Sequence, residues 1–322
     1  MEVTIIIPNY NGKHFMEACL ESLNHQTCKD FQILVVDNHS SDGSAAYMKE
    51  QHPEIPLISL DENYGFSKAV NIGIKHTDTP YVILLNNDTV VDKNYVAEML
   101  KAIKASPRIF SVSSKMIQMY NPSLIDSAGD SFTVLGWGFC RGSNQSVTRY
   151  TKPESVFTAC AGAAIYRRDV FEKIGYFDEL HFAYLEDIDV GYRARIHNYI
   201  NMYCPTAIVQ HVGSGTSGSK YNTFKVKLSA RNNIWLLYKN MPFLQLLLNL
   251  LPLTLGFLIK AAFFQKKGFG HDYLSGLKEG FLRCKECKKV PFRLRRLPNY
   301  IKIEFQLIRY TFSYFINKCL KK

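Results

Sequence analysis

The first hundred residues alternate between short apolar runs and longer segments of helical length. Four runs of β-branched and aliphatic residues predict strands at 3–7, 32–36, 56–59 and 81–85, each followed by turn or capping residues. The segments between them predict helices at about 13–28, 43–51, 66–76 and 94–105. Nearly continuous apolar strands that alternate with helices predict an α/β fold, a mostly parallel sheet covered on both faces.

The pattern changes twice farther along the chain. Residues 118–158 are rich in Gly, Ser, Tyr and Thr and predict loops and short strands that shape a pocket. A strand at 163–166, a helix at 169–174 and a longer helix at about 186–196 are expected next. After residue 235, long apolar stretches alternate with Lys and Arg. We therefore predict two regions, an α/β domain over 1–230 and a basic, apolar helical tail over 231–322.

Polar clusters follow the first, second and fourth predicted strands, and ligands of such sheets bind beyond the carboxyl ends of the strands. Asn86-Asn87-Asp88-Thr89 follows the run 81–85, and a carboxylate flanked by amides is a suitable ligand for Mg²⁺ or Mn²⁺. Asp37 ends the second strand, where it could accept bonds from a nucleobase or a ribose hydroxyl. The alternative for both aspartates is a turn or a helix cap.

Five carboxylates fall within the twelve residues 178–189: Asp178, Glu179, Glu186, Asp187 and Asp189. Crowding of this kind is costly unless a cation or an acceptor hydroxyl requires it. On a helix beginning near 186, Asp187 and Asp189 point about 200° apart, and Asp189 has Arg193 as an i,i+4 partner. Asp187 is therefore the candidate catalytic base. The alternative is a solvated acidic helix start, which the helix dipole favours.

Three further motifs are weaker. His211 closes the apolar run 207–211 and is either a structural histidine or a metal ligand. The Gly-rich segment 213–218 matches a dinucleotide-binding pattern but comes late in the chain, so we interpret it as a flexible loop. Cys284 and Cys287 form a lone C-x-x-C, whereas a structural zinc requires four ligands.

Charge is distributed unevenly along the 322 residues, of which 47% are apolar. Residues 1–230 carry 21 Lys and Arg against 24 Asp and Glu, whereas residues 231–322 carry 18 against 4. The whole net charge of +11 therefore arises in the tail, and an anionic partner is expected there.

The tail predicts association with a membrane surface. Residues 243–264 would form a helix of about 33 Å, nominally long enough to span a bilayer, although Gln245, Asn249, Pro252 and Lys260 interrupt it. Exporting the basic segment that follows would violate the positive-inside rule, so we favour helices that lie in the interface of an anionic membrane. The alternatives are an ordinary buried helix and a nucleic-acid-binding arm; the latter would not explain so many Leu and Phe, so no nucleic acid is expected.

The start of the chain shows no basic and apolar leader, and the eight cysteines are scattered, as is typical of a reducing compartment. We therefore expect a peripheral protein on the cytoplasmic face of the membrane.

Taken together, the motifs resemble those of the inverting glycosyltransferases of family 2, in particular the rhamnosyltransferase-like branch. The matching segments occur in family order over about residues 3–240: Ile6-Ile7-Pro8-Asn9-Tyr10-Asn11-Gly12, Val35-Val36-Asp37-Asn38-His39-Ser40-Ser41-Asp42-Gly43-Ser44, Glu62-Asn63-Tyr64-Gly65-Phe66, Leu84-Leu85-Asn86-Asn87-Asp88-Thr89, Gly175-Tyr176-Phe177-Asp178-Glu179, Tyr184-Leu185-Glu186-Asp187-Ile188-Asp189 and Arg231-Asn232-Asn233. The resemblance implies a GT-A fold with a Rossmann-like sheet, a nucleotide-sugar donor and a divalent metal.

The resemblance also implies roles for individual residues. The donor would be bound by Pro8, Asn11, Asp37, Asn63, Asn71, Asn86 and Asn87. Asp88 and His211 would hold Mg²⁺ or Mn²⁺, and Asp187 would be the base, supported on the acceptor side by Glu186, Asp189 and Asp178. The chain departs from the family at Asn86, where many relatives have Asp, and at Asn87, where the branch often has Pro.

The expected function is therefore transfer of rhamnose or another hexose from a dTDP- or UDP-sugar to a lipid-linked or polysaccharide acceptor of a cell-surface glycan. An inverting displacement needs a base for the acceptor hydroxyl and neutralisation of the departing diphosphate. The alternative functions are a sugar nucleotidylyltransferase, whose Gly-rich and Lys-bearing motif is missing near residues 8–12, and a non-catalytic membrane-binding module, which would not need the carboxylates.

Overall fold

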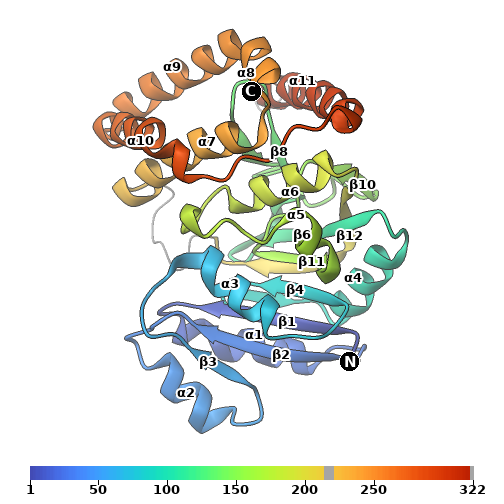
Figure 1. Ribbon diagram of the computed structural model, residues 1–322. Helices are drawn as coiled ribbons and strands as arrows, with labels where there is room; N and C mark the ends of the chain where they lie inside the picture. Colours follow the sequence, from blue (N-terminus) through green and yellow to red (C-terminus); the bar gives the residue numbers. More distant parts are fainter. Residues whose placement is uncertain (214–220, 320–322) are drawn as a thin grey trace.

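The computed structural model describes residues 1–213 and 221–319, and Figure 1 shows a large sheet with a layer of C-terminal helices above it. The strands are β1 (Val3–Asn9), β2 (Phe31–Asp37), β3 (Leu57–Ser59), β4 (Tyr81–Leu85), β5 (Thr89–Val91), β6 (Ile109–Gln118), β7 (Asn121–Ser127), β8 (Asp130–Phe132), β9 (Gly138–Cys140), β10 (Glu154–Val156), β11 (Ala163–Arg167) and β12 (Ile200–His211). Of these, β8 and β9 form a separate two-stranded ribbon.

The main sheet has the strand order β3-β2-β1-β4-β11-β6-β12-β10, with β5 paired to β12 and β7 paired to β6. The pairs β1–β2, β1–β4 and β2–β3 are parallel, as the sequence predicts. The pair β6–β12 is also parallel, although β6 was not predicted from the sequence. Strand β11 is antiparallel to both of its neighbours, β4 and β6. The predicted loops and short strands of 118–158 correspond to β7, β8, β9 and β10.

The helices are α1 (Lys13–Asn24), α2 (Ser44–Gln51), α3 (Gly65–Lys75), α4 (Tyr95–Lys104), α5 (Arg168–Ile174), α6 (Glu186–Ile196), α7 (Thr223–Asn240), α8 (Phe243–Leu248), α9 (Leu250–Lys266), α10 (Gly270–Arg283) and α11 (Leu297–Cys319). Short 3₁₀ helices occupy Glu179–His181, Cys284–Glu286 and Leu294–Arg296.

Two apolar layers cover the sheet because side chains of a strand alternate between its faces. In β1, Ile5 and Ile7 pack with α1 and α4, whereas Ile6 packs with α3, α5 and α6. All three isoleucines are fully buried. This sandwich fixes the carboxyl ends of β1, β2 and β4 at one edge of the sheet.

The C-terminal helices are attached to this sandwich through α6. Ile188 and Tyr192 of α6 share an apolar cluster with Leu236 of α7, Leu253 of α9 and Leu307 of α11. The predicted boundary after residue 230 falls inside α7, so it marks a change of composition rather than a break between elements.

The apolar stretch 243–264 is not one helix. It is divided into α8 and α9, which meet at Asn249. Within the described parts of the chain, we find no helix that combines the length and the apolar character needed to cross a bilayer.

Two of the three weaker motifs, the C-x-x-C pair and the Gly-rich segment, gain no support as ligand sites. Among the described residues, the cluster of side chains with metal-binding geometry does not include Cys284 or Cys287. Of the Gly-rich segment 213–218, only Gly213 lies within the described residues.

Candidate active site

A cleft of about 700 Å³ opens at the carboxyl edge of the sheet, where the sequence places the site. Eight of the predicted site residues line it: Pro8, Asn63, Asn86, Asn87, Asp88, Glu186, Asp187 and His211. The predicted metal ligands and the predicted base therefore face one cavity, although a hundred residues separate Asp88 from Asp187. Five predicted residues do not line it: Asn11, Asp37, Asn71, Asp178 and Asp189.

Asn9 ties the ends of three strands together at the floor of the cleft. Its side-chain nitrogen donates to Asp37 Oδ1 at 2.7 Å, and its oxygen accepts from Asn87 Nδ2 at 2.6 Å. Asp37 is only 3% exposed, and its second oxygen accepts from the Ser40 amide. Asp37 thus connects the ends of β1 and β2. Its predicted contact with the nucleobase or ribose of the donor stays a prediction.

The remaining predicted donor-binding residues divide into two groups. Asn63 lines the cleft, and its side-chain oxygen accepts from Asn38 Nδ2 at 2.8 Å. Asn11 lies outside the cleft wall and accepts a hydrogen bond from the Ser41 amide. Asn71 is buried on α3, where its amide donates to the Phe177 carbonyl and accepts from the Phe177 amide, so it fixes the loop at Phe177. Its contact with the donor stays a prediction.

Asp88 and His211 are brought together by strand pairing. β5 and β12 are antiparallel with Thr89 opposite His211, so the residue before Thr89 lies beside the histidine. His211 Nε2 is 3.3 Å from Asp88 Oδ1, and its Nδ1 is 2.8 Å from Asp126 Oδ2. Asp126, on β7, was not predicted, because nothing in the sequence of that irregular region distinguishes it.

The environment of His211 is anionic. Burial by itself lowers the pKa of this imidazole, but hydrogen bonds to Asp126 and Asp88 and the charges of the two carboxylates outweigh burial and raise the pKa to about 9. The position next to Nε2 therefore favours positive charge.

The candidate base lies at the first turn of α6. Asp187 Oδ1 accepts from the Ile188 amide at 2.7 Å, and Glu186 beside it is 7% exposed with Oε2 lacking a hydrogen-bond partner among the described residues. Tyr184 and Leu185 have φ angles of 70° and 68°, an uncommon conformation that is typical of functional turns. This turn presents the carboxylates to the cleft.

A second aspartate, Asp130 on β8, accompanies Asp187 and was not predicted. Ligand atoms of Asp130, Cys160 and Asp187 all lie within 4.8 Å of one another. Burial and the charge of Asp187 raise the pKa of Asp130 well above its usual range. Burial also raises the pKa of Asp187, and the hydrogen bonds from Ile188 and Asp130 offset only part of that rise.

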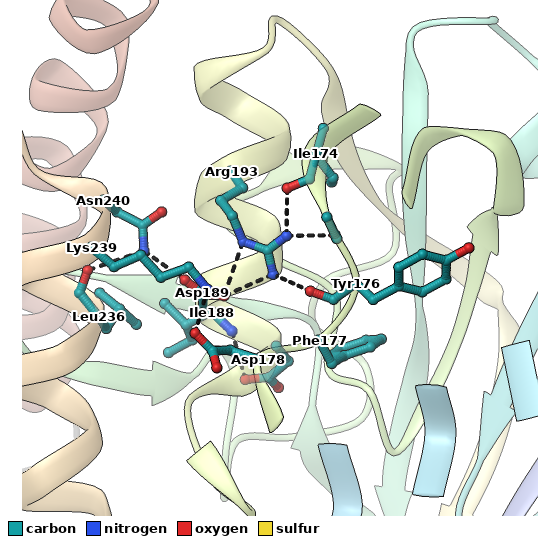
Figure 2. A network of polar contacts seen from close by, with 12 residues as sticks. Ile174, Tyr176, Phe177, Asp178, Ile188, Asp189, Arg193, Leu236, Lys239 and Asn240 are labelled. Atoms are coloured by element: carbon teal, nitrogen blue, oxygen red, sulfur yellow. Dashed lines mark hydrogen bonds and ion pairs between the residues drawn. The ribbon is translucent and has the colours of Figure 1, made fainter. Parts of the chain in front are cut away.

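Asp189 and Asp178 belong to a buried network behind the cleft, shown in Figure 2. Asp189 pairs with Arg193 at 2.7 Å and with Lys239 at 3.0 Å, while Asn240 donates to its second oxygen. Lys239 also bonds Asp178 at 2.6 Å. The sequence-based pairing of Asp189 with Arg193 is confirmed. Lys239 thus ties α7 to α6 through Asp189 and to the cap of the 3₁₀ helix Glu179–His181 through Asp178. The acceptor-side role of these two aspartates stays a prediction.

Comparison with known proteins agrees with this architecture. The teichoic acid poly(glycerol phosphate) polymerase of Staphylococcus epidermidis is 36% identical over 91 residues, which cover 27% of this chain and 13% of that protein. The N-acetylglucosaminyl-diphospho-decaprenol L-rhamnosyltransferase of Mycobacterium tuberculosis is 26% identical over 237 residues, 66% of this chain and 77% of that protein.

A solved structure shows the same fold. The mannosyltransferase PcManGT from Pyrobaculum calidifontis, in complex with GDP-Man and Mn²⁺, superposes with a TM-score of 0.54 at 15% identity, covering 88% of this chain and 87% of that one. The family model described as glycosyl transferase family 2 matches residues 4–175. Because this match extends over more than half of the sequence, the chain belongs to glycosyl transferase family 2.

Proposed function

We propose that this protein is an inverting glycosyltransferase that moves rhamnose or another hexose from a dTDP- or UDP-sugar to a lipid-linked or polysaccharide acceptor in cell-surface glycan synthesis. The observation that carries the proposal is the convergence of Asp88, His211 and Asp187 on one cleft. The rhamnosyltransferase among its relatives supports this sugar and this class of acceptor. Membership of family 2 counts against the alternative of a sugar nucleotidylyltransferase.

Side chains at the ends of β4 and β12 fit a divalent cation. Asp88 offers a carboxylate oxygen and His211 a ring nitrogen 3.3 Å away, while Asp126 holds the other ring nitrogen and fixes the orientation of the ring. A mixed oxygen and nitrogen donor set favours Mn²⁺ over Mg²⁺, which prefers oxygen alone. When bound, the ion would neutralise charge on the departing diphosphate.

Asp187 supplies the other half of the chemistry. The acceptor oxygen attacks the anomeric carbon, the bond from that carbon to the phosphate oxygen breaks, and its electron pair leaves with the nucleoside diphosphate. The acceptor proton passes to the Asp187 carboxylate, which is partly accessible from the cleft. One displacement of this kind inverts the anomeric configuration.

The test is nucleotide release from a panel of dTDP-, UDP- and GDP-sugars, each with and without Mn²⁺, in the presence of a lipid-linked acceptor. We expect one donor to be used, with release stimulated by Mn²⁺ and suppressed by EDTA. Pyrophosphate-dependent formation of a nucleoside triphosphate would indicate a nucleotidylyltransferase, and a panel without turnover on any donor would contradict the proposed function.

We also propose that the C-terminal helices rest on the cytosolic face of an anionic membrane. Among the described residues, 22 of the 27 exposed large apolar side chains lie at or after Phe243. The surfaces of soluble monomeric proteins rarely expose so many large apolar side chains in one region. The same region carries the excess of basic residues. Apolar side chains next to Lys and Arg match a bilayer interface with anionic headgroups.

Sedimentation with lipid vesicles tests this attachment. Leu251 and Leu258 lie seven residues apart on one face of α9 and are 81% and 62% exposed. Replacing both with Glu should weaken binding to phosphatidylglycerol vesicles by at least about tenfold, because two apolar contacts are lost. Tyr120→Glu, at a site 79% exposed but outside the tail, should bind like the wild type.

Two outcomes would contradict the attachment. One is a wild-type protein that stays in the supernatant with anionic vesicles. The other is a dimer that the α9 substitutions dissociate, because a second copy would then cover the apolar face.

A further inference from the structure

We propose that Asp130 is a positioning residue whose protonated carboxyl donates a hydrogen bond to Asp187 and thereby keeps the base ionised and oriented towards the acceptor. The inference rests on the proposed function, because it concerns the same base. It assigns a role to a side chain that no motif of the sequence identifies.

Backbone hydrogen bonds hold the two aspartates next to each other. Thr158 connects them, because its amide and carbonyl pair with the backbone of Asp130 while its hydroxyl donates to the Asp187 carbonyl at 2.7 Å. Asp130 is 6% exposed, and its Oδ1 accepts a hydrogen bond at 3.3 Å from the hydroxyl of Ser127, the last residue of β7. Thr158 therefore holds the main chains of Asp130 and Asp187 side by side, with carboxyl oxygens of the two residues within 4.8 Å of each other.

Close packing of α6 strengthens this arrangement. A Cβ at residue 191 would lie 2.2 Å from Thr158 Oγ1, so only glycine lets α6 approach the Thr158 segment. Gly129, with a φ of +85°, makes the turn that leads into β8, and a Cβ there would meet Val156 at 2.8 Å. Both glycines are needed to bring Asp130 and Asp187 within reach.

The β8–β9 ribbon is held from its other side by the C-terminal helices. Trp137, in the turn of the ribbon, donates its indole N–H to the Gly256 carbonyl of α9 at 3.1 Å, and its ring packs against Tyr314 of α11. The Val134 amide donates to Thr311 Oγ1 of α11 at 3.1 Å. Asp130 therefore stands on a braced element rather than on a mobile loop.

The groups around Asp130 and Asp187 favour a state in which one of these two carboxyl groups is protonated. The titratable groups that face it are Glu186 on α6, Cys140 on β9, Cys160, and Tyr166 on β11. None of these is a cation, and no ion pair between described residues includes Asp130 or Asp187. Two adjacent buried carboxylates cannot both ionise, so one of them retains a proton.

Geometry and environment assign that proton to Asp130. Asp187 accepts the Ile188 amide and lies at the positive end of the α6 dipole, and both features favour its charged form. Asp130 is more deeply buried, and its pKa is raised well above the usual range, whereas the rise at Asp187 is offset by its donors. In the resulting state, Asp130 is neutral and donates a hydrogen bond to the ionised Asp187.

The experiment compares Asp130→Asn with Asp130→Ala in the full-length enzyme, measuring transfer across a pH series. Asn keeps a hydrogen-bond donor of the same shape. Asp130→Asn should therefore retain most of the wild-type turnover, and its rate should fall at the same low pH (the acid limb of the pH–rate profile). Ala removes the donor, so turnover at neutral pH should fall by about 10- to 100-fold, the value of a hydrogen bond to a charged group. The acid limb should also move upward by about one to two pH units, because the Asp187 anion has lost its donor.

The two variants distinguish this role from its competitors. If Asp130→Asn loses as much activity as a variant of Asp187, Asp130 is itself the base and the inference fails. If Asp130→Ala loses activity with an unmoved acid limb, its role is only structural and the inference also fails. Thermal melting of both variants, together with Asp169→Asn at an exposed surface pair, provides the matched control for folding.

Failure of the inference is separable from failure of the proposed function. An enzyme that transfers sugar and depends on Asp187, but tolerates Asp130→Ala at every pH, retains the proposed function and loses the inference. An enzyme indifferent to Asp187 loses both.

Discussion

Replacing Asp187 with Asn is expected to abolish sugar transfer while leaving donor binding intact. Asn has the same shape and can still contact the Ile188 region, but it cannot accept the acceptor proton at neutral pH. A positioned base contributes about 10²- to 10⁴-fold to a rate, so kcat should fall by at least that factor. The donor is expected to contact the Asp88 end of the cleft, so its dissociation constant should change little.

Turnover by single-time-point product analysis and donor affinity by calorimetry measure the two halves of this prediction. Asp169→Asn is a suitable comparison, because Asp169 is exposed and forms an ion pair with Lys173 on the same helix. An Asp187→Asn enzyme with wild-type kcat would remove the assignment of the base. If donor binding and kcat were both lost, Asp187 would be a donor-binding residue instead of the base.

Replacing Asp88 with Asn is expected to have the second large effect, on metal-dependent turnover. Asn86 and Asn87 are neutral amides, so Asp88 is the carboxylate that this strand end offers to a cation. Its removal leaves His211 beside Asp126 and weakens the charge that attracts the ion. Because a metal contributes several kcal/mol to the stabilisation of a leaving group, turnover should fall by at least about 10²-fold.

The measurement is turnover against Mn²⁺ concentration for the wild type, Asp88→Asn and Asp92→Asn. Asp92 is an exposed aspartate four residues farther along whose side chain caps the Asn94 amide, so its variant should behave like the wild type. Equal Mn²⁺ dependence in Asp88→Asn and the wild type would exclude Asp88 as a ligand.

The sequence predicts those parts of the molecule in which local pattern and burial agree. The strand Tyr81–Leu85 is fully buried and ends at an Asn-rich turn, so its observed limits equal the predicted ones. Helix α6 covers the predicted range 186–196, and its i,i+4 spacing correctly separates Asp189 from Asp187. Periodicity suffices here because neighbours in the sequence determine which face each side chain occupies.

The parts that were missed depend on partners far along the chain. Strand β6 (Ile109–Gln118) is buried along almost all of its length, but its serines interrupt the apolar pattern by which a buried strand is recognised. These serines are tolerated inside the protein because Ser114 donates to the Ala163 carbonyl and Ser111 donates to the Asn201 side chain. Asp130 and Asp126 lie on short strands without periodicity. Their functional neighbours, Asp187 and His211, are 57 and 85 residues away, so only the folded sheet reveals the pairs.

Asn71 shows what a resemblance leaves open. The resemblance implies a contact with the donor, whereas in the structure both ends of its amide bond the backbone of Phe177. These contacts between distant parts of the chain are visible only in the folded protein, and the contact with the donor stays a prediction.

The measurement that tests the account most directly is the anomalous diffraction of Mn²⁺ in crystals grown with the nucleoside diphosphate of the preferred donor. Among the described residues, the two groups to compare as metal ligands are Asp88 with His211, and Asp130 with Cys160 and Asp187. We predict a peak bound by Asp88 and His211 and bridged to the diphosphate, with Asp187 free of metal and facing the vacant sugar position. A peak bound by Asp130, Cys160 and Asp187 would contradict both the proposed metal site and the proposed base.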